Sequence, residues 1–216
     1  MGKPFKLTGF CAALAVIALV LAAPVPAWSE TAEISLVMSN QARTKGKKPA
    51  VEFPAPEGMV KIKNPGGLIK NGWPDSPGDL IFYAPAEAWN RFIIEEAGRP
   101  MPDAMAFIFT MNVAGSNEIG PVDLAPLQEQ MKDDYAARGI DLLDEGPGFL
   151  TIRTIESRPS GQTGATFEAA TVTSMIFTEK GQLLVLFMGS ALDSAYKSRL
   201  HADAMQWRDA CLKLKQ

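Results

Sequence analysis

Two strand-like segments near the C-terminus, followed directly by a helix, constrain the fold of this chain more than any other feature. Ala165–Thr178 is rich in Thr, Val, Ile and Phe, and Leu183–Gly189 reads LLVLFMG. The second segment is apolar at both alternating positions, which predicts a strand in the middle of a sheet covered on both faces. Glu179–Gly181 fits a three-residue hairpin loop, so we expect the two strands to be antiparallel neighbours.

An amphipathic helix is predicted to follow the hairpin and to cover the sheet. Ser190 and Asp193 have the S-x-x-D spacing of a capping box and predict where this helix starts. Apolar residues then recur at intervals of three and four, as in a helix with one buried face: Tyr196, Leu200, Ala204, Trp207, Cys211 and Leu214. The pattern therefore predicts that this helix packs on the hairpin and buries the Cys211 thiol.

The remaining segments predict further strands and two more helices. Strands are expected at Ala32–Met38, Gly58–Lys63, Asp79–Ala84, Met105–Asn112 and Phe149–Ile155. One helix is expected at Pro85–Ala97, with a strand as the alternative, and its buried face would hold Trp89, Phe92 and Ile93.

The second helix is expected to start at Asp123 and to end at Gly139. Its core face comprises Leu124, Leu127, Met131 and Tyr135, and its predicted solvated face comprises Gln128, Glu129, Lys132 and Asp133. The acidic residues that come after it, Asp141, Asp144 and Glu145, are interpreted with Asp133 and Asp134 as helix-surface and turn carboxylates.

These elements predict an α+β fold with an antiparallel sheet of about five to seven strands sandwiched between helices, closed by a long hairpin and a final amphipathic helix. The 216 residues divide into a signal peptide at 1–29, an N-terminal strand with an exposed basic and proline-rich loop at 30–56, and a single α+β domain at 57–216.

The N-terminus has the layout of a secretory signal peptide. Lys3 and Lys6 precede an apolar run from Phe10 to Ala23, and small residues follow it. This run is shorter than the ~20 apolar residues that a membrane-spanning helix needs, although an uncleaved inner-membrane anchor is the alternative. Cleavage is expected before Trp28 or Glu30, which predicts a periplasmic protein with no stable membrane insertion.

Charge and cysteine content limit the partners of the exported chain. Removal of the signal peptide lowers the basic residues from 21 to 19 and leaves 24 acidic residues, a net charge of −5. An acidic surface disfavours nucleic acid as a partner. Only Cys211 of the two cysteines remains, so no intramolecular disulfide is expected.

No segment predicts an assembled catalytic, metal or cofactor site. His201 is the only histidine and is interpreted as a residue on the flank of the last helix. Ser190 lacks a surrounding G-x-S-x-G motif, and zinc would need more Cys and His ligands than the mature chain has. We therefore predict a protein that is not an enzyme and has no cofactor.

Two loop features are the candidate partner-binding residues. The first is Trp73, in a loop rich in Gly and Pro, where a large aromatic side chain either packs back on the protein or faces a partner. The second is a run of basic residues that is either a solvated loop or a contact patch: Arg43, Lys45, Lys47 and Lys48.

The order of elements resembles the PsbP-like fold, which a lumenal extrinsic protein of photosystem II, a eukaryotic Ran-release factor and exported bacterial proteins share. The segments that carry the resemblance are FPAPEGMVKIK at Phe53–Lys63, the mid-chain helix, the long hairpin at Phe167–Gly189 and the final helix. The similarity covers roughly Ala50–Gln216, lies in the architecture and includes no diagnostic motif. It implies a non-enzymatic binding or assembly role.

The sequence thus predicts an exported binding or assembly module of the bacterial cell envelope, whose partner is a protein or another envelope component. The alternative is a periplasmic hydrolase that works with a pair of carboxylates, since such pairs cleave glycosidic bonds without histidine.

We predict that the exported protein begins at Trp28 or Glu30, because the small residues before these positions suit signal-peptide cleavage. N-terminal sequencing of the protein from the periplasmic fraction measures this directly. A mature protein that retains Met1–Ala23 would instead show that the segment serves as an anchor.

Overall fold

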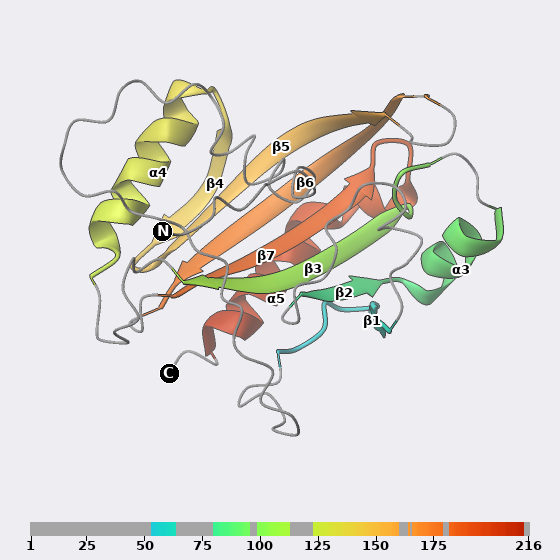
Figure 1. Cartoon of the computed structure of the whole chain (residues 1–216), viewed down its shortest axis with the longest axis horizontal. Coiled ribbons are helices and arrows are strands. Elements are labelled where there is room, and N and C mark those ends of the chain that lie inside the picture. Colours follow the sequence, from blue (N-terminus) through green and yellow to red (C-terminus); the bar gives the residue numbers. More distant parts are fainter. Residues whose placement is uncertain are drawn as a thin grey trace, which may run out of the picture.

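The computed structural model describes residues 53–63, 80–95, 99–112, 123–159, 164, 166–178 and 182–213. Its strands form one seven-stranded antiparallel sheet in the order β1-β2-β3-β7-β6-β5-β4, and three α-helices accompany the sheet in this part of the chain (Figure 1). The predicted α+β class with an antiparallel sheet is therefore confirmed. The predicted strand at Ala32–Met38 lies outside the described residues.

The elements in chain order are β1 (Val60–Ile62), β2 (Ile81–Ala84), α3 (Ala86–Glu95), β3 (Ala104–Asn112), α4 (Ala125–Ala137), β4 (Asp141–Gly146), β5 (Phe149–Pro159), β6 (Thr166–Phe177), β7 (Gln182–Ala191), the 3₁₀ turn η1 (Ala195–Ser198) and α5 (Leu200–Lys213). The segment after β2 is thus a helix, α3, as predicted. None of the helices in the described ranges is long and apolar enough to cross a membrane.

Strand β7 lies in the centre of the sheet, between β3 and β6, and both of its faces are buried. Leu183, Val185 and Phe187 pack into one hydrophobic cluster, and Leu184, Leu186 and Met188 pack into another on the opposite side. The two-sided burial predicted from LLVLFMG is therefore confirmed. The hairpin loop Glu179–Gly181 lies outside the described residues, and the backbone N–H of Thr178 donates to Gln182 at 2.8 Å beside it.

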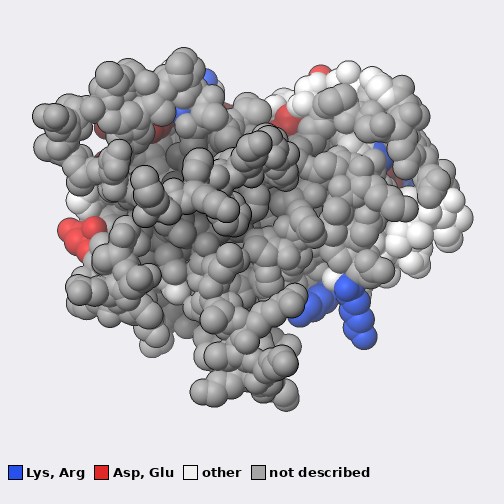
Figure 2. Space-filling view, in the orientation of Figure 1, with Lys and Arg blue, Asp and Glu red and all other residues white. Residues whose placement is uncertain are grey.

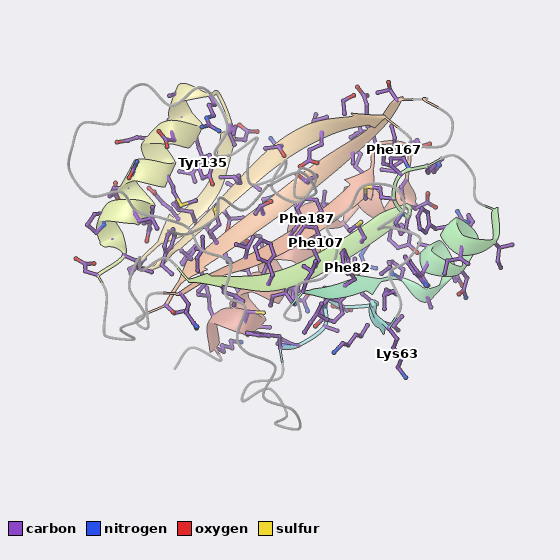
Figure 3. The ribbon with its side chains drawn as sticks, viewed as in Figure 1. Lys63, Phe82, Phe107, Tyr135, Phe167 and Phe187 are labelled. Atoms are coloured by element: carbon purple, nitrogen blue, oxygen red, sulfur yellow. The ribbon has the colours of Figure 1, made fainter. Side chains whose placement is uncertain are left out.

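The two sides of the sheet can be named after the helices that join their clusters. On the α4 face, the α4 residues Leu127, Met131 and Tyr135 belong to the cluster, together with Trp89 of α3. Phe107 and Phe187 stack there with ring centroids 4.4 Å apart, and Figure 3 shows Phe82 in the same row. On the α5 face, α5 packs against β6 and β7, and it lies behind the sheet in Figure 1.

Helix α5 buries the predicted stripe of Leu200, Ala204, Trp207 and Cys211. Tyr196 differs from the prediction, because it lies in η1 and is only partly buried. Leu214 lies outside the described residues.

Trp207 also fixes the start of the described chain. Its indole Nε1–H donates to the Pro54 carbonyl at 2.7 Å, and its ring meets Tyr83 edge to face at 5.9 Å. Phe53 is partly buried in the same cluster and Pro56 is buried, whereas Ala55 between them is exposed. The end of the segment predicted to be exposed is therefore packed in part.

The predicted capping box at Ser190 and Asp193 is wrong. Ser190 is fully buried inside β7, where it pairs with Ala104 of β3, and its hydroxyl donates to the Asp103 carbonyl at 3.2 Å. Ser194 instead caps the following 3₁₀ turn, because its hydroxyl accepts the Tyr196 N–H at 3.2 Å. Strand β7 stays paired with both of its neighbours as far as Ser190, so this residue lies in the strand and cannot cap the helix.

The acidic residues after α4 lie on an edge strand and not, as predicted, on a helix surface and in a turn. Asp141, Asp144 and Glu145 belong to β4. Each accepts from one cation: Arg153 pairs with Asp141, Arg208 with Asp144 and Lys132 with Glu145. Charged side chains on an edge strand oppose pairing with another chain.

The opposite edge, β1, is also charged. Lys61 and the following Lys63 are exposed, and lysine side chains project from the lower border of the molecule in Figure 2, where Figure 3 labels Lys63. Both edges of the sheet therefore disfavour further strand pairing.

Two further side chains depart from the helix predictions. Gln128 was expected in solvent but is buried, because its amide closes the turn between β4 and β5: it donates to Gly146 at 2.8 Å and accepts the Gly148 N–H at 3.1 Å. Ile93 was expected in the core but is 49% exposed, whereas Trp89, one turn earlier, is buried. Helix α4 ends as predicted, with Gly139 at a φ of 67°. Its N-cap is Leu124 and not the predicted Asp123, whose carboxylate accepts the Ala125 N–H at 3.0 Å.

We expect Trp207→Ala to lower the free energy of unfolding by about 3–5 kcal/mol, because the change removes a buried ring and leaves a cavity. Lys213→Ala, at an exposed position of the same helix, should change it by less than about 0.5 kcal/mol. Urea-unfolding curves of both variants measure this difference. A Trp207→Ala protein as stable as its parent would mean that α5 is not docked on the sheet.

Thiol labelling gives an independent readout of the same docking. Burial raises the pKa of the Cys211 thiol to about 12, so the reactive thiolate is scarce at neutral pH. We expect labelling only after denaturation of the parent protein. Rapid labelling in native buffer would contradict the packing of α5.

Candidate functional site

The residues predicted to bind a partner lie outside the described residues: Trp73, Arg43, Lys45, Lys47 and Lys48. Their role stays a prediction. His201 is exposed on α5, as expected for a residue on the helix flank. No group of three or more potential metal ligands occurs among the described residues.

The candidate site is a pocket of about 690 Å³ at the end of the sheet next to α3. It is formed by three segments: α3, the stretch that leads into β3, and the stretch that connects β7 to η1. Its walls combine four charged residues with apolar side chains. Its apolar lining residues include Phe92, Met101, Pro102 and Tyr196.

The sheet brings these segments together. The Asp103 carbonyl accepts the Ala191 N–H at 3.0 Å and the Ser190 hydroxyl at 3.2 Å, so the residue before β3 is joined to the end of β7. Asp193 follows two residues after that end. The Asp103 and Asp193 carboxylates, far apart in the chain, thus line one pocket.

Four charged side chains form a continuous series of ion pairs in the pocket, which we call the charge chain. Arg91 Nη1 contacts Asp103 Oδ2 at 2.7 Å, and Asp103 Oδ1 contacts Arg99 Nη1 at 2.7 Å. Arg99 Nη2 then contacts Asp193 Oδ2 at 2.8 Å. The charges alternate in the order Arg91, Asp103, Arg99, Asp193, so each interior charge lies between two opposite ones.

The interior of the charge chain is more buried than its ends. The Asp103 side chain is 15% exposed and that of Arg99 is 37% exposed, whereas Arg91 is 53% and Asp193 is 68% exposed. The Arg99 guanidinium also lies 5.7 Å from the centre of the Phe167 ring, which Figure 3 labels at this end of the sheet. The pocket therefore offers solvent one positive end and one negative end.

A second group of charged residues, around Arg208, holds elements of the fold together. Arg208 is buried on α5 and donates to Asp144 at 2.7 Å and to Thr151 at 3.1 Å. It also donates to Asp209 and lies 4.6 Å from the Phe149 ring centre. Most of its N–H donors are thus used within the protein, and the residue joins α5 to β4 and β5.

The sequence analysis missed most of the pocket. Arg91, Arg99 and Asp103 were not singled out, and Asp193 was interpreted as a helix cap. The local signal was weak: Arg99 and Asp103 are four residues apart, with prolines at 100 and 102 that exclude a helix. The pairing of Arg99 with Asp193 spans 94 residues and depends on the sheet.

Comparisons with protein-family models, with curated proteins and with solved structures each found no match.

We expect Asp103→Asn to destabilise the protein by about 1–3 kcal/mol, because this largely buried carboxylate accepts from both arginines. Asp193→Asn makes the same chemical change at the exposed end and should cost less than about 1 kcal/mol. Urea unfolding of the two variants tests the difference. Equal effects would show that Asp103 contributes no more to the stability of the protein than Asp193 does.

Proposed function

We propose that this protein is an exported, non-catalytic binding module of the bacterial cell envelope, and that the pocket at the end of the sheet is its binding site. The observation that carries the proposal is the charge chain: its partly buried middle holds two more exposed, opposite charges beside apolar walls. Such a combination suits recognition of a ligand, because apolar walls supply affinity and a few fixed polar groups supply orientation.

The size and composition of the pocket support this reading. Its volume of about 690 Å³ lies in the range of roughly 300–1,000 Å³ that is usual for ligand sites. The exposed part of the Arg91 guanidinium can donate to a carboxylate or a carbonyl group. Phe92 and Tyr196 offer apolar surface at the same place.

The envelope location rests on the sequence. The signal-peptide layout before Trp28, the net charge of −5 after cleavage and the resemblance to the PsbP-like fold favour a periplasmic protein that binds a protein or another envelope component. For the fold, we propose helices on both sides of the sheet and the long C-terminal hairpin. For the partner, we propose that it is not a nucleic acid.

A carboxylate hydrolase is supported less well. Asp103 and Asp193 do share the pocket, but Arg99 lies between them and donates to both. A pair of carboxylates that cleaves a glycosidic bond needs the substrate between its members. In this pocket a guanidinium has that position. The inner-membrane anchor remains the alternative for the location and is decided by the N-terminal sequence.

We expect Ala195→Trp to abolish capture of envelope partners, because Ala195 lines the pocket at an exposed position and an indole ring there would obstruct a ligand. Ala137→Trp, at an exposed position of α4, is the matched control and should retain them. The measurement is a pulldown from envelope extract with each tagged protein, after a melting curve has confirmed folding.

Two further arms of the pulldown examine the loop residues. Trp73→Ala and a deletion of Arg43–Lys48 test whether partner contacts extend beyond the pocket. If Ala195→Trp captured every partner of the parent while one of these variants lost them, the binding surface would be the loops and the proposal for the pocket would be wrong.

A further inference from the structure

We propose that the pocket binds a zwitterion: a small molecule or short peptide that has a free carboxylate, a free ammonium group and an apolar side chain. The inference deepens the proposed function and rests on the pocket being the binding site. It follows from the two ends of the charge chain, which are opposite in sign and exposed: Arg91 is held by Asp103, and Asp193 is held by Arg99.

Arg91 is the carboxylate-binding end. A guanidinium has five N–H donors, and Arg91 makes one hydrogen bond with the described residues, through Nη1 to Asp103. Its other donors make no hydrogen bond with the described residues, and the side chain is 53% exposed. The bond to Asp103 restricts the side chain before a ligand arrives, which lowers the entropy lost on binding. A carboxylate is the group that matches two parallel N–H donors.

Asp193 is the ammonium-binding end. Its side chain is 68% exposed, and its carboxylate has about four lone-pair sites, of which Arg99 uses two in contacts of 2.8 and 3.4 Å. The 3₁₀ turn η1, which Ser194 caps, fixes the backbone beside it. An ammonium group has three donors and can bind the remaining lone pairs.

The balance of charge excludes simpler ligands as the best fit. Two arginines and two aspartates give the pocket no net charge. A plain anion would be attracted by Arg91 but repelled by the carboxylate of Asp193. A plain cation would be attracted by Asp193 but repelled by Arg91. A ligand that has both charges is attracted at both ends.

The apolar walls define the rest of the ligand. Phe92, Met101, Pro102 and Tyr196 line the pocket together with the charge chain. Burial of an aliphatic side chain against this surface is favourable in proportion to the apolar area removed from water. We therefore expect leucine-like side chains to bind more tightly than glycine.

A free amino acid and a short peptide both have this chemistry, so the experiment includes each. Isothermal titration calorimetry of the exported chain is carried out with leucine and with leucyl-leucine. For each compound, the N-acetylated form lacks the ammonium group and the C-terminal amide lacks the carboxylate. The tighter of the two zwitterions identifies the source, because the two differ in the separation of their charges.

In the parent protein, we expect the preferred zwitterion to bind about 10- to 100-fold more tightly than either blocked form, since each lost charge removes one charge-assisted interaction. Arg91→Gln should remove the preference over the C-terminal amide and keep the preference over the acetylated form. Asp193→Asn should do the opposite. This exchange of preferences pairs each end of the ligand with one residue.

Arg153→Gln and Asp141→Asn are the matched controls. Arg153 and Asp141 form an ion pair on β5 and β4 with exposed fractions of 52% and 60%, close to those of Arg91 and Asp193. Both control variants should bind like the parent protein.

Two results would overturn the inference. In the first, an acetylated or amidated compound binds as tightly as the zwitterion; in the second, no compound of the series binds at millimolar concentration. The proposed function fails separately, if Ala195→Trp keeps every envelope partner. Loss of partners in Ala195→Trp together with either of the two titration results would leave the pocket as the binding site and reject only the zwitterion.

Discussion

The structure depends above all on the pairing of β7 with β3. Each strand alone is a run of apolar residues, and their antiparallel register, from Ala104 opposite Ser190 to Asn112 opposite Gln182, joins the two parts of the sheet. The same register stacks Phe107 on Phe187 in the core. At its end it fixes the Asp103 backbone next to Ala191, and the charge chain begins from that point.

The two arginine clusters illustrate how burial decides what a charged side chain can do. Arg208 is buried, and its partners on α5, β4 and β5 use most of its donors, so it contributes to specificity of packing. Arg91 is half exposed and is oriented by one carboxylate oxygen of Asp103. A charge that is oriented but not saturated can act on a ligand, whereas a saturated one cannot.

The sequence predicted those elements whose residue pattern is strong and local. Strands β6 and β7 are apolar runs, and the stripe of α5 and the core face of α4 have helical periodicity; each element is present in the structure. The errors occur where tertiary context decided the outcome. Strand β4 reads DLLDEG and lacks an apolar face of its own, because it is an edge strand stabilised by three cations from elsewhere.

Ser190 and Gln128 are errors of a second kind. A capping motif and a polar helix face are local signals. In the structure, pairing with β3 places Ser190 in β7, and hydrogen bonds to the β4–β5 turn hold Gln128 in the interior. The pocket could not be predicted for the same reason. Its charges come from segments that only the β3–β7 register places side by side, and a register is not visible in the spacing of any one segment.

The position of β7 also has a consequence for the order in which the chain can fold. Strands β1, β2 and β3 form one half of the sheet and β4, β5 and β6 the other, and β7 is the strand that joins them. It ends at Ala191, so about nine-tenths of the 216 residues must emerge before the halves can meet. A polypeptide with this topology cannot complete its sheet until β7 has been synthesised.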